Sequence, residues 1–279
     1  MLLVDKPAGV TSHDVVGAAR RAFHERRIGH AGTLDPFATG LLILLVGRAT
    51  RLLRFLDDEP KEYAATIRFG AEMDTDDLTG EVIRRAPLPD AARVAEALPA
   101  LTGEIEQVPP AYSAKQVEGR RAYHAARSGA PLVLAPVRVT VYEWRLVGWR
   151  GAELDVVITC GTGTYIRSLA RDLGRLVESA AHLSALRRLR CGAFDVHDAV
   201  SLEAVRGGGI PVRPPLQALP TLPVERLDDA AVARVTRGMR VTATVSGARA
   251  ALIDGGDDLV ALGERDGDDW QPRVVLRDA

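Results

Sequence analysis

The segment 27–42 is where residue types and their spacing point to chemistry. Asp35 lies there with glycines on both sides and is followed by Pro36, which has no N–H and favours an extended backbone in the residue before it. Such a constrained loop can hold a carboxylate in one direction, as a catalytic nucleophile requires. A lone Asp-Pro pair would more simply close a turn, but the glycines, His30 and the nearby arginines favour the catalytic interpretation.

Cofactor and metal sites are not indicated by the sequence. The segment 161–163 (GTG) is not a dinucleotide fingerprint, because Ile166 stands where that pattern has its third glycine. Cys160 and Cys191 show no CxxC or Cys/His spacing, which argues against a disulfide framework or a structural zinc and suits a reducing cytosol. A P-loop and a cluster of metal ligands are also missing, so we expect a reaction without metal or redox cofactor.

The bulk properties indicate a soluble globular protein. Of the 279 residues, 47% are hydrophobic and 26% charged, which is ordinary for this class. The first residues lack the basic start and apolar stretch of a signal peptide. The longest apolar run, 41–46, is far shorter than the roughly 18 residues that a membrane span needs. We therefore expect a cytoplasmic protein that is not bound to a membrane.

The net charge of −1 hides three clusters of basic residues. They are Arg20, Arg21, Arg26, Arg27, Arg48, Arg51 and Arg54; Lys115, Arg120, Arg121 and Arg127; and Arg167, Arg171, Arg175, Arg187, Arg188 and Arg190. Acidic residues concentrate elsewhere, at 74–77 and 254–269. Basic blocks of this kind can bind nucleic-acid phosphates while the total charge balances. Solvated helix faces would produce the same pattern, so charge permits RNA binding without establishing it.

Periodic patterns predict the elements that position these residues. Apolar and polar residues alternate over 63–69, 137–141 and 154–160, which predicts strands, the last two as an antiparallel hairpin. A Thr-x-x-Asp capping box at 11–14 precedes one predicted helix, and helical spacing predicts another over 166–177. Because helices interrupt the strands without a regular βαβ order, we expect an α+β fold. Its mixed, mainly antiparallel sheet would have flanking helices.

A linker divides the predicted fold into two domains. Three glycines at 207–209 and several prolines between 211 and 223 mark it. Past the linker, 228–237 is expected to form a helix ended by Gly238, and short strands separated by Gly and Asp turns follow. We take residues 1–219 as the catalytic domain and residues 220–279 as a small, mostly β domain.

Several blocks in the first domain resemble the bacterial tRNA pseudouridine-55 synthases, the TruB family. They are DKPAGVTSH (5–13), HAGTLDPFATGLL (30–42), KEY (61–63), DTDD (74–77) with Gly80, VPPAYSA (108–114), GTGTYIR (161–167) and LRRL (186–189). One departure follows the YSA block, where the family usually has a lysine in the second place and this chain has Gln116, preceded by Lys115. We assign a phosphate contact to neither. The resemblance implies the pseudouridine synthase type of fold.

The resemblance also implies the reaction and its nucleophile. Family members isomerise uridine-55 in the T-loop of tRNA to pseudouridine: uracil is detached from ribose at N1, turned within the site and rejoined through C5. Asp35 is implied as the nucleophile, whether it attacks the sugar or the base. Arg167 is implied as its partner, because an arginine stays charged and can bind a carboxylate through two hydrogen bonds. Taken alone, Arg167 could instead contact a phosphate.

Aromatic and apolar residues would hold the uracil. The resemblance implies that Tyr63 stacks on the base, and its hydroxyl is a candidate acceptor for the C5 proton, although a phenol with an ordinary pKa of about 10 is a poor base at neutral pH. Tyr165 is implied as a second wall of the pocket and Leu186 as its floor. From the pattern alone, Tyr63 and Leu186 are equally core residues.

A uridine inside a folded loop must be flipped out to be reached, at a cost of a few kcal/mol. The resemblance implies that His30 fills the vacated space or packs on the flipped nucleotides; a lone histidine is more commonly an ordinary loop residue. Asp77 is assigned to substrate contact, with organisation of its acidic turn as the alternative. The C-terminal region resembles a short PUA-like RNA-binding domain.

The expected partner is therefore the T stem-loop of tRNA, bound by a monomer without a metal. One alternative is an RNA-binding tRNA folding aid with a degenerate synthase domain, although Asp35, Tyr63, Tyr165 and Arg167 are all present. Another is a hydrolase that uses Asp35. A phosphatase would need metal-binding carboxylates nearby and a glycosidase a carboxylate pair, and the segment around Asp35 offers neither.

Overall fold

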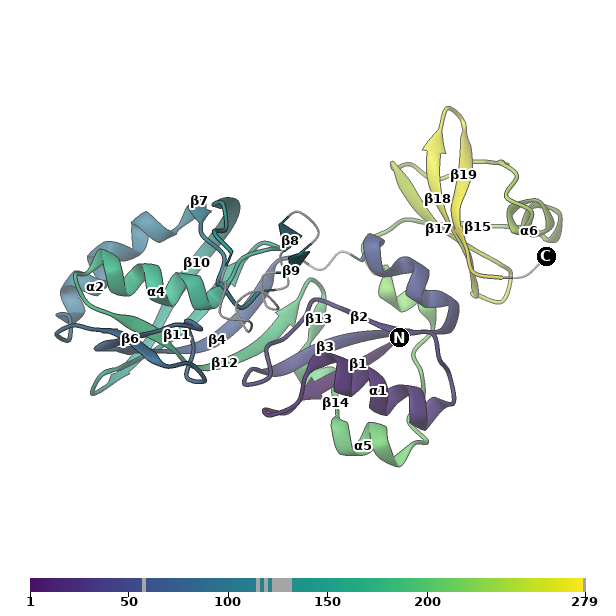
Figure 1. The fold of residues 1–279 in the computed structure, drawn as a ribbon. Coiled ribbons are helices and arrows are strands. Elements are labelled where there is room, and N and C mark those ends of the chain that lie inside the picture. The colour runs from purple at the N-terminus through teal and green to yellow at the C-terminus, as the bar shows by residue number, and fades with distance from the viewer. Residues whose placement is uncertain (57–58, 114–115, 118–119, 122–131, 278–279) are drawn as a thin grey trace. The chain divides into compact units, whose positions relative to one another are not determined.

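The computed structural model describes residues 1–56, 59–113, 116–117, 120–121 and 132–277 (Figure 1). The chain forms two compact units. One consists of Met1–Pro36, Leu41–Asp57 and Val196–Ala279, and the other of Phe37–Gly40 and Asp58–Asp195. Within the described ranges, none of the helices is both long and apolar enough to cross a membrane.

The second unit is built on a sheet with β4 (Lys61–Phe69) near its middle. The strand order is β12 (Ala181–Cys191), β4, β11 (Glu153–Cys160), β10 (Val137–Arg150) and β7 (Gly103–Gln107), with all neighbours antiparallel. The other edge of β12 pairs in parallel with Thr39 and Gly40, the first residues of β3 (Thr39–Val46). In β4 every second residue from Lys61 is buried, which is the physical basis of the alternation in the sequence.

Helices cover this sheet. Helix α4 (Ile166–Leu176) packs against β12 and β4, and α2 (Ala91–Ala97) with the following turn η2 (Leu98–Leu101) packs against α4 (Figure 1). The shorter strands are β5 (Ala71–Met73), β6 (Val82–Arg85), β8 (Gln116–Val117), β9 (Arg120–Arg121) and β13 (Phe194–Asp195). The predicted hairpin is β10 paired with β11, and the predicted helix at 166–177 is α4.

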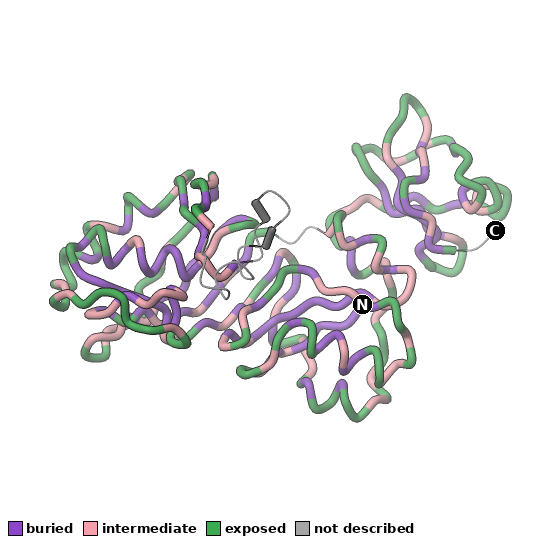
Figure 2. Tube along the Cα trace, in the orientation of Figure 1, coloured by how far each residue is buried: buried purple, intermediate pink, exposed green. Residues whose placement is uncertain are grey.

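The first unit contains the rest of β3, whose residues 40–45 are all buried (Figure 2). Its other elements are β1 (Leu2–Lys6), α1 (Ser12–Phe23), β2 (Ile28–Ala31), η1 (Gly47–Phe55), η3 (Val196–Asp198), β14 (Val200–Ser201) and α5 (Leu202–Gly207). Helices α1 and α5 bury their apolar faces against β1 and β3. The predicted capping box is confirmed: the Thr11 hydroxyl accepts from Asp14 N at 3.0 Å, and the Asp14 carboxylate accepts from Thr11 N at 2.8 Å.

The C-terminal part of this unit has a sheet of its own. Its strand order is β15 (Val224–Arg226), β17 (Arg249–Ile253), β18 (Leu259–Asp266), β19 (Asp269–Val275) and β16 (Val241–Thr242). The turn η4 (Pro215–Ala218) precedes it, and α6 (Asp229–Thr236) packs its apolar side on a separate core around the fully buried Trp270. This confirms a small, mostly β C-terminal part, while the exact boundary near residue 220 stays a prediction.

Candidate active site

The loop that carries Asp35 is tied to its surroundings on both sides. Before Asp35, the Ser12 hydroxyl accepts from Leu34 N at 2.9 Å and donates to Leu34 O at 3.1 Å. After it, Pro36 O accepts from Gly9 N at 2.8 Å and from Lys6 Nζ at 3.3 Å. Asp35 itself is half-buried. The backbone on either side of this carboxylate is thus held by residues from the N-terminal motif.

Lys6 explains why that motif accompanies the Asp35 loop. Its side chain is fully buried, and its ammonium group also donates to Val10 O at 2.8 Å and Pro7 O at 3.0 Å. A buried lysine is stable only when its donors are satisfied. Here the donors bind the turn after β1 to the segment around Pro36. The motif was recognised in the sequence, but the roles of Lys6 and Ser12 were not.

His30 lies on β2, opposite Leu44 of β3, and is half-buried. Its neighbour in the strand, Ala31, is buried. Strand β2 therefore presents the histidine at the entrance to the Asp35 loop, four residues before that loop's buried Leu34. The contact of His30 with a flipped nucleotide stays a prediction.

In the second unit, Tyr63 and Leu186 lie on one face of the sheet. Tyr63 of β4 is opposite Arg188 of β12, and Ala65 is opposite Leu186, so these positions alternate onto the same side. Tyr63 and Leu186 are each 8% exposed. Both are thus buried, which agrees with either interpretation of the sequence, a core residue or a residue of the uracil pocket.

Burial raises the pKa of the Tyr63 phenol to about 12, against the opposing charge and hydrogen bond of Arg188. At neutral pH only about one molecule in 10⁵ would carry a tyrosinate. The raised pKa therefore favours an aromatic surface here over a strong base. Arg188, which belongs to a basic cluster and to the LRRL block but had no predicted role, is itself 1% exposed.

Gly40, near the end of the block 30–42, must be a glycine for a steric reason. Its φ is +101°, and a Cβ there would lie 2.2 Å from the carbonyl oxygen of Arg188. The parallel pairing of β3 with β12 requires this close approach. The side chain of neighbouring Thr39 donates to Leu186 O at 3.5 Å, so the end of the motif adjoins the apolar residue of the candidate site.

Arg167, in the first turn of α4, is 4% exposed. Its guanidinium donates to Asp77 Oδ2 at 3.3 Å, to Thr75 O at 2.9 Å and to Tyr112 O at 2.9 Å. A guanidinium has five donor hydrogens in a rigid fork, so three such contacts set its orientation. Its pairing with Asp35 stays a prediction.

Asp77 is 4% exposed and is occupied within its own turn. Its Oδ1 accepts from Thr79 N at 2.9 Å, Thr79 Oγ1 at 2.5 Å and Thr75 Oγ1 at 3.0 Å. The turn is bound to β12, where Leu183 O accepts from Leu78 N at 2.9 Å. These contacts correspond to the alternative that Asp77 organises the acidic turn, and through it Arg167. Direct contact with substrate stays a prediction.

The GTG loop is tethered to the start of β4, which explains why these two motifs occur together. Lys61 donates to Thr162 Oγ1 at 2.7 Å, and Glu59 Oε1 accepts from Thr162 N at 2.6 Å. Tyr165 follows the loop as the N-cap of α4 and is half-buried. Lys115 lies outside the described residues, and Gln116 is described only by its backbone in β8.

Comparison with known proteins identifies the family. A family model described as "TruB family pseudouridylate synthase (N terminal domain)" matches residues 20–166, and one described as "tRNA pseudouridylate synthase B C-terminal domain" matches residues 167–208. The chain belongs to the TruB family of pseudouridylate synthases. It is therefore an isomerase, as the resemblance in its sequence implied, and the hydrolase alternative is disfavoured.

Individual relatives match this synthase along almost its whole length. The tRNA pseudouridine synthase B of Thermobifida fusca (strain YX) is 44% identical over 287 residues, covering 99% of this chain and 98% of the relative. That of Gloeobacter violaceus (strain ATCC 29082 / PCC 7421) is 44% identical over 286 residues, with the same two coverages. The structure titled "Crystal Structure of a Cbf5-Nop10-Gar1 Complex" is 26% identical with a TM-score of 0.74, covering 99% of this chain and 84% of that one. The expected pseudouridine synthase fold is confirmed.

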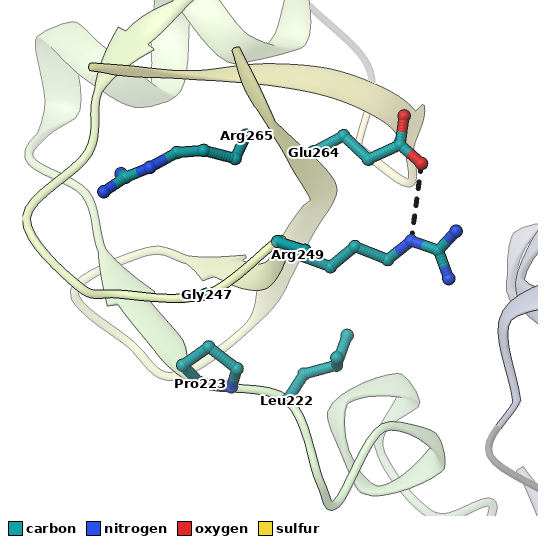
Figure 3. Close-up of a pocket in the computed structure, with 7 residues that line it drawn as sticks. Leu222, Pro223, Gly247, Arg249, Glu264 and Arg265 are labelled. Atoms are coloured by element: carbon teal, nitrogen blue, oxygen red, sulfur yellow. Dashed lines mark hydrogen bonds and ion pairs between the residues drawn. The ribbon is translucent and has the colours of Figure 1, made fainter. Parts of the chain in front are cut away.

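The C-terminal sheet of the synthase carries a hollow of about 500 Å³ that the sequence analysis did not anticipate. Arg249, Glu264 and Arg265 line it together with Leu222 and Pro223 (Figure 3). Arg249 and Glu264 are joined by an ion pair of 3.3 Å, and the Arg265 guanidinium lies 4.9 Å from the centre of the Trp270 ring. Among the described residues, no group of His, Cys, Asp and Glu is arranged to hold a metal ion.

Proposed function

We propose that this synthase isomerises uridine-55 in the T-loop of tRNA, with Asp35 as the nucleophile. The observation that carries the proposal is the loop in which Asp35 lies, since Leu34 and Pro36 are each tied by hydrogen bonds to the N-terminal motif. A fixed carboxylate can form and release a covalent bond in one geometry. The two relatives named above are tRNA pseudouridine synthases B, which supports tRNA as the substrate.

In the proposed reaction the bond between uracil N1 and the ribose breaks, a bond forms from the ribose to C5, C5 loses its proton and N1 gains one, so the net change is an isomerisation. Asp35 must be ionised to act as a nucleophile, yet burial under RNA would raise its pKa and favour the neutral acid. Arg167 is proposed to oppose this shift by its fixed positive charge. Its guanidinium is already oriented by Asp77, Thr75 and Tyr112, so little reorganisation would accompany RNA binding.

The target uridine is proposed to flip into a pocket walled by Tyr63 and Tyr165, with Leu186 as its floor. The pKa of Tyr63, raised to about 12, supports stacking as the main role of this ring, with removal of the C5 proton as the finer proposal. His30 would occupy the space that the uridine vacates. Closure of the pocket would also keep water from trapping the detached base, which would turn the isomerase into a glycosidase.

The C-terminal sheet is proposed to bind RNA as a PUA-like domain. Arg249 and Arg265 border its hollow, and an arginine on an aromatic ring can both stack on a base and pair with a phosphate. Glu264 holds Arg249 in place through their ion pair. The hollow therefore offers both charge and apolar surface to an RNA strand.

The decisive experiment incubates the protein with an unmodified T-loop hairpin and maps pseudouridine by position. We expect conversion at the position equivalent to uridine-55 and none when that uridine is replaced by cytidine. Asp35→Asn keeps the side chain's shape but removes its charge, so binding should remain while turnover falls by more than about 10³-fold. Modification at another uridine, or turnover by Asp35→Asn above that level, would contradict the proposal.

A further inference from the structure

Gln107, the last residue of β7, makes an unusual contact with the backbone of Tyr165. Its amide Nε2 donates to Tyr165 O at 3.1 Å, and its Oε1 accepts from Tyr165 N at 2.8 Å. The side chain is 1% exposed, so both bonds are shielded from water. A glutamine offers one donor group and one acceptor on a planar amide, and here it pairs with a residue as a neighbouring strand would.

This contact lies at the residue that begins α4. Tyr165 is the N-cap residue, with an extended backbone (φ −98°, ψ 109°), and its side chain makes no capping hydrogen bond. Helices usually begin with Ser, Thr, Asp or Asn, whose side chains cap the first turn locally. The start of α4 is held instead from β7, 58 residues earlier in the chain.

The segment after Gln107 continues the attachment along the first turn and a half of α4. Val108 O accepts from Ser168 Oγ at 2.9 Å and from Arg171 Nη2 at 2.9 Å. Tyr112 O accepts from Arg167 at 2.9 Å. Four α4-region residues are therefore bound to one short segment, and Gln107 holds the first of them.

We infer that Gln107 is a positioning residue for Tyr165 and Arg167. It contacts no reacting atom; it sets where α4 begins and so where the Tyr165 ring and, two residues later, the guanidinium are placed. The inference rests on the proposed function, which assigns these two residues to the uracil pocket and to Asp35. A displacement of about 1 Å at a catalytic group can cost about 10²-fold in rate.

The test compares Gln107→Met with Gln107→Glu in the full-length protein. Gln107→Met keeps the length of the side chain and removes both hydrogen bonds. We expect the single-turnover rate at saturating T-loop hairpin to fall by about 10²-fold, while the dissociation constant of the hairpin changes little. Gln217→Met, an exposed glutamine outside the site, controls for the substitution itself.

Gln107→Glu adds a readout that loss of stability would not produce. Ionised, the carboxylate still accepts from Tyr165 N but cannot donate to Tyr165 O. Protonated, its O–H restores the donor. Burial beside a carbonyl raises the pKa of such a glutamate, whereas the guanidiniums of Arg167 and Arg171, which are bound to the same segment, lower it. The rate of Gln107→Glu relative to wild type should therefore rise as the pH is lowered from about 8 to about 5.

Val205→Ala, which leaves a cavity in the core between α5 and α1, serves as a variant of comparable destabilisation away from α4, and each protein is assayed well below its own Tm. An equal loss of rate in Val205→Ala, a flat pH ratio for Gln107→Glu, or full activity of Gln107→Met would overturn the inference. A wild-type protein that leaves the hairpin unmodified would overturn the proposed function and this inference together. Active wild type, inactive Asp35→Asn and fully active Gln107→Met would overturn the inference alone.

Discussion

Two buried carboxylates in this synthase are satisfied in opposite ways. Asp77 in the catalytic sheet's acidic turn shares its oxygens between neutral donors of that turn and the charged Arg167. Glu225 of the C-terminal sheet is 3% exposed, and its bonds come from the neutral groups of Thr244, Val245 and Trp270. Asp77, with its charged donor, orients the Arg167 guanidinium, whereas Glu225, with only neutral donors, joins parts of the C-terminal sheet.

The donors of Glu225 come from two separate places in the C-terminal sheet. Thr244 N and Val245 N bind it at 2.7 and 3.1 Å from the segment after β16, and the Trp270 indole binds it at 2.8 Å from β19. An ionised carboxylate can accept about four hydrogen bonds, so these donors satisfy it without a cation. Glu225 thus stabilises the domain and has no group to present to RNA.

The largest expected effect is that of Asp77→Asn. It removes the charge of the carboxylate that accepts from the buried Arg167, and breaking a buried ion pair from one side costs about 3–5 kcal/mol. Pseudouridine formation should fall at the same time, because the guanidinium loses one of the contacts that orient it. Urea unfolding and single-turnover assays measure the two effects.

Asp155→Asn is the matched control for Asp77→Asn. It removes the same charge from an Asp–Arg pair with Arg150 at 2.8 Å, but the two side chains are 28% and 63% exposed, against 5% for each side chain of the Asp77–Arg167 pair. Exposed pairs contribute about 0–1 kcal/mol, so stability and activity should stay near those of wild type. Equal losses in the two variants would show that the Asp77 pair has no special role.

A smaller effect is expected for Glu225→Gln. The amide keeps the shape but turns one acceptor into a donor that faces other donors, which leaves buried groups unsatisfied at about 1–3 kcal/mol. The C-terminal sheet should unfold at a lower urea concentration. Its unfolding is measured by Trp270 fluorescence in a protein in which Trp144 and Trp149 are replaced by Phe. The reaction rate at saturating RNA should be unchanged; a large fall would mean that Glu225 also serves the chemistry.

The smallest effect is the pH dependence of the same sheet. Burial by itself would raise the pKa of Glu225, but hydrogen bonds from Thr244 and Trp270 outweigh it and lower the pKa below its ordinary value. This stabilisation is complete above the ordinary glutamate pKa of about 4.3 and is lost as the pH falls through the lower folded-state value. The free energy of unfolding should therefore fall more steeply with decreasing pH in wild type than in Glu225→Gln. Identical pH dependences in the two proteins would contradict the lowered pKa of Glu225.

Features with a local physical cause could be predicted from the sequence. The alternation in β4 comes from one covered face, and the Thr11–Asp14 capping box joins residues three apart. Both patterns are visible in a short window of the chain. The family blocks then predicted the family and its type of fold, and the family match and the structural similarity confirmed both.

Features that depend on long-range contacts could not be predicted in this way. Lys6 reaches Pro36 O across 30 residues, and Gln107 reaches Tyr165 across 58. In the sequence Lys6 is an ordinary polar residue inside a recognised block, and Gln107 is another that directly precedes one. Nothing in its neighbours indicates which distant backbone group it will bind.

The sequence by itself determined which residues are available for the reaction and the elements on which they lie, because residue type and periodicity are local properties. Only the tertiary structure decided how they are held: that Gly40 must lack a side chain beside Arg188 O, and that Asp77 is turned toward Arg167. The reason is physical. A buried polar group is stable only with its partners in place, and those partners are chosen by the packing of the whole sheet.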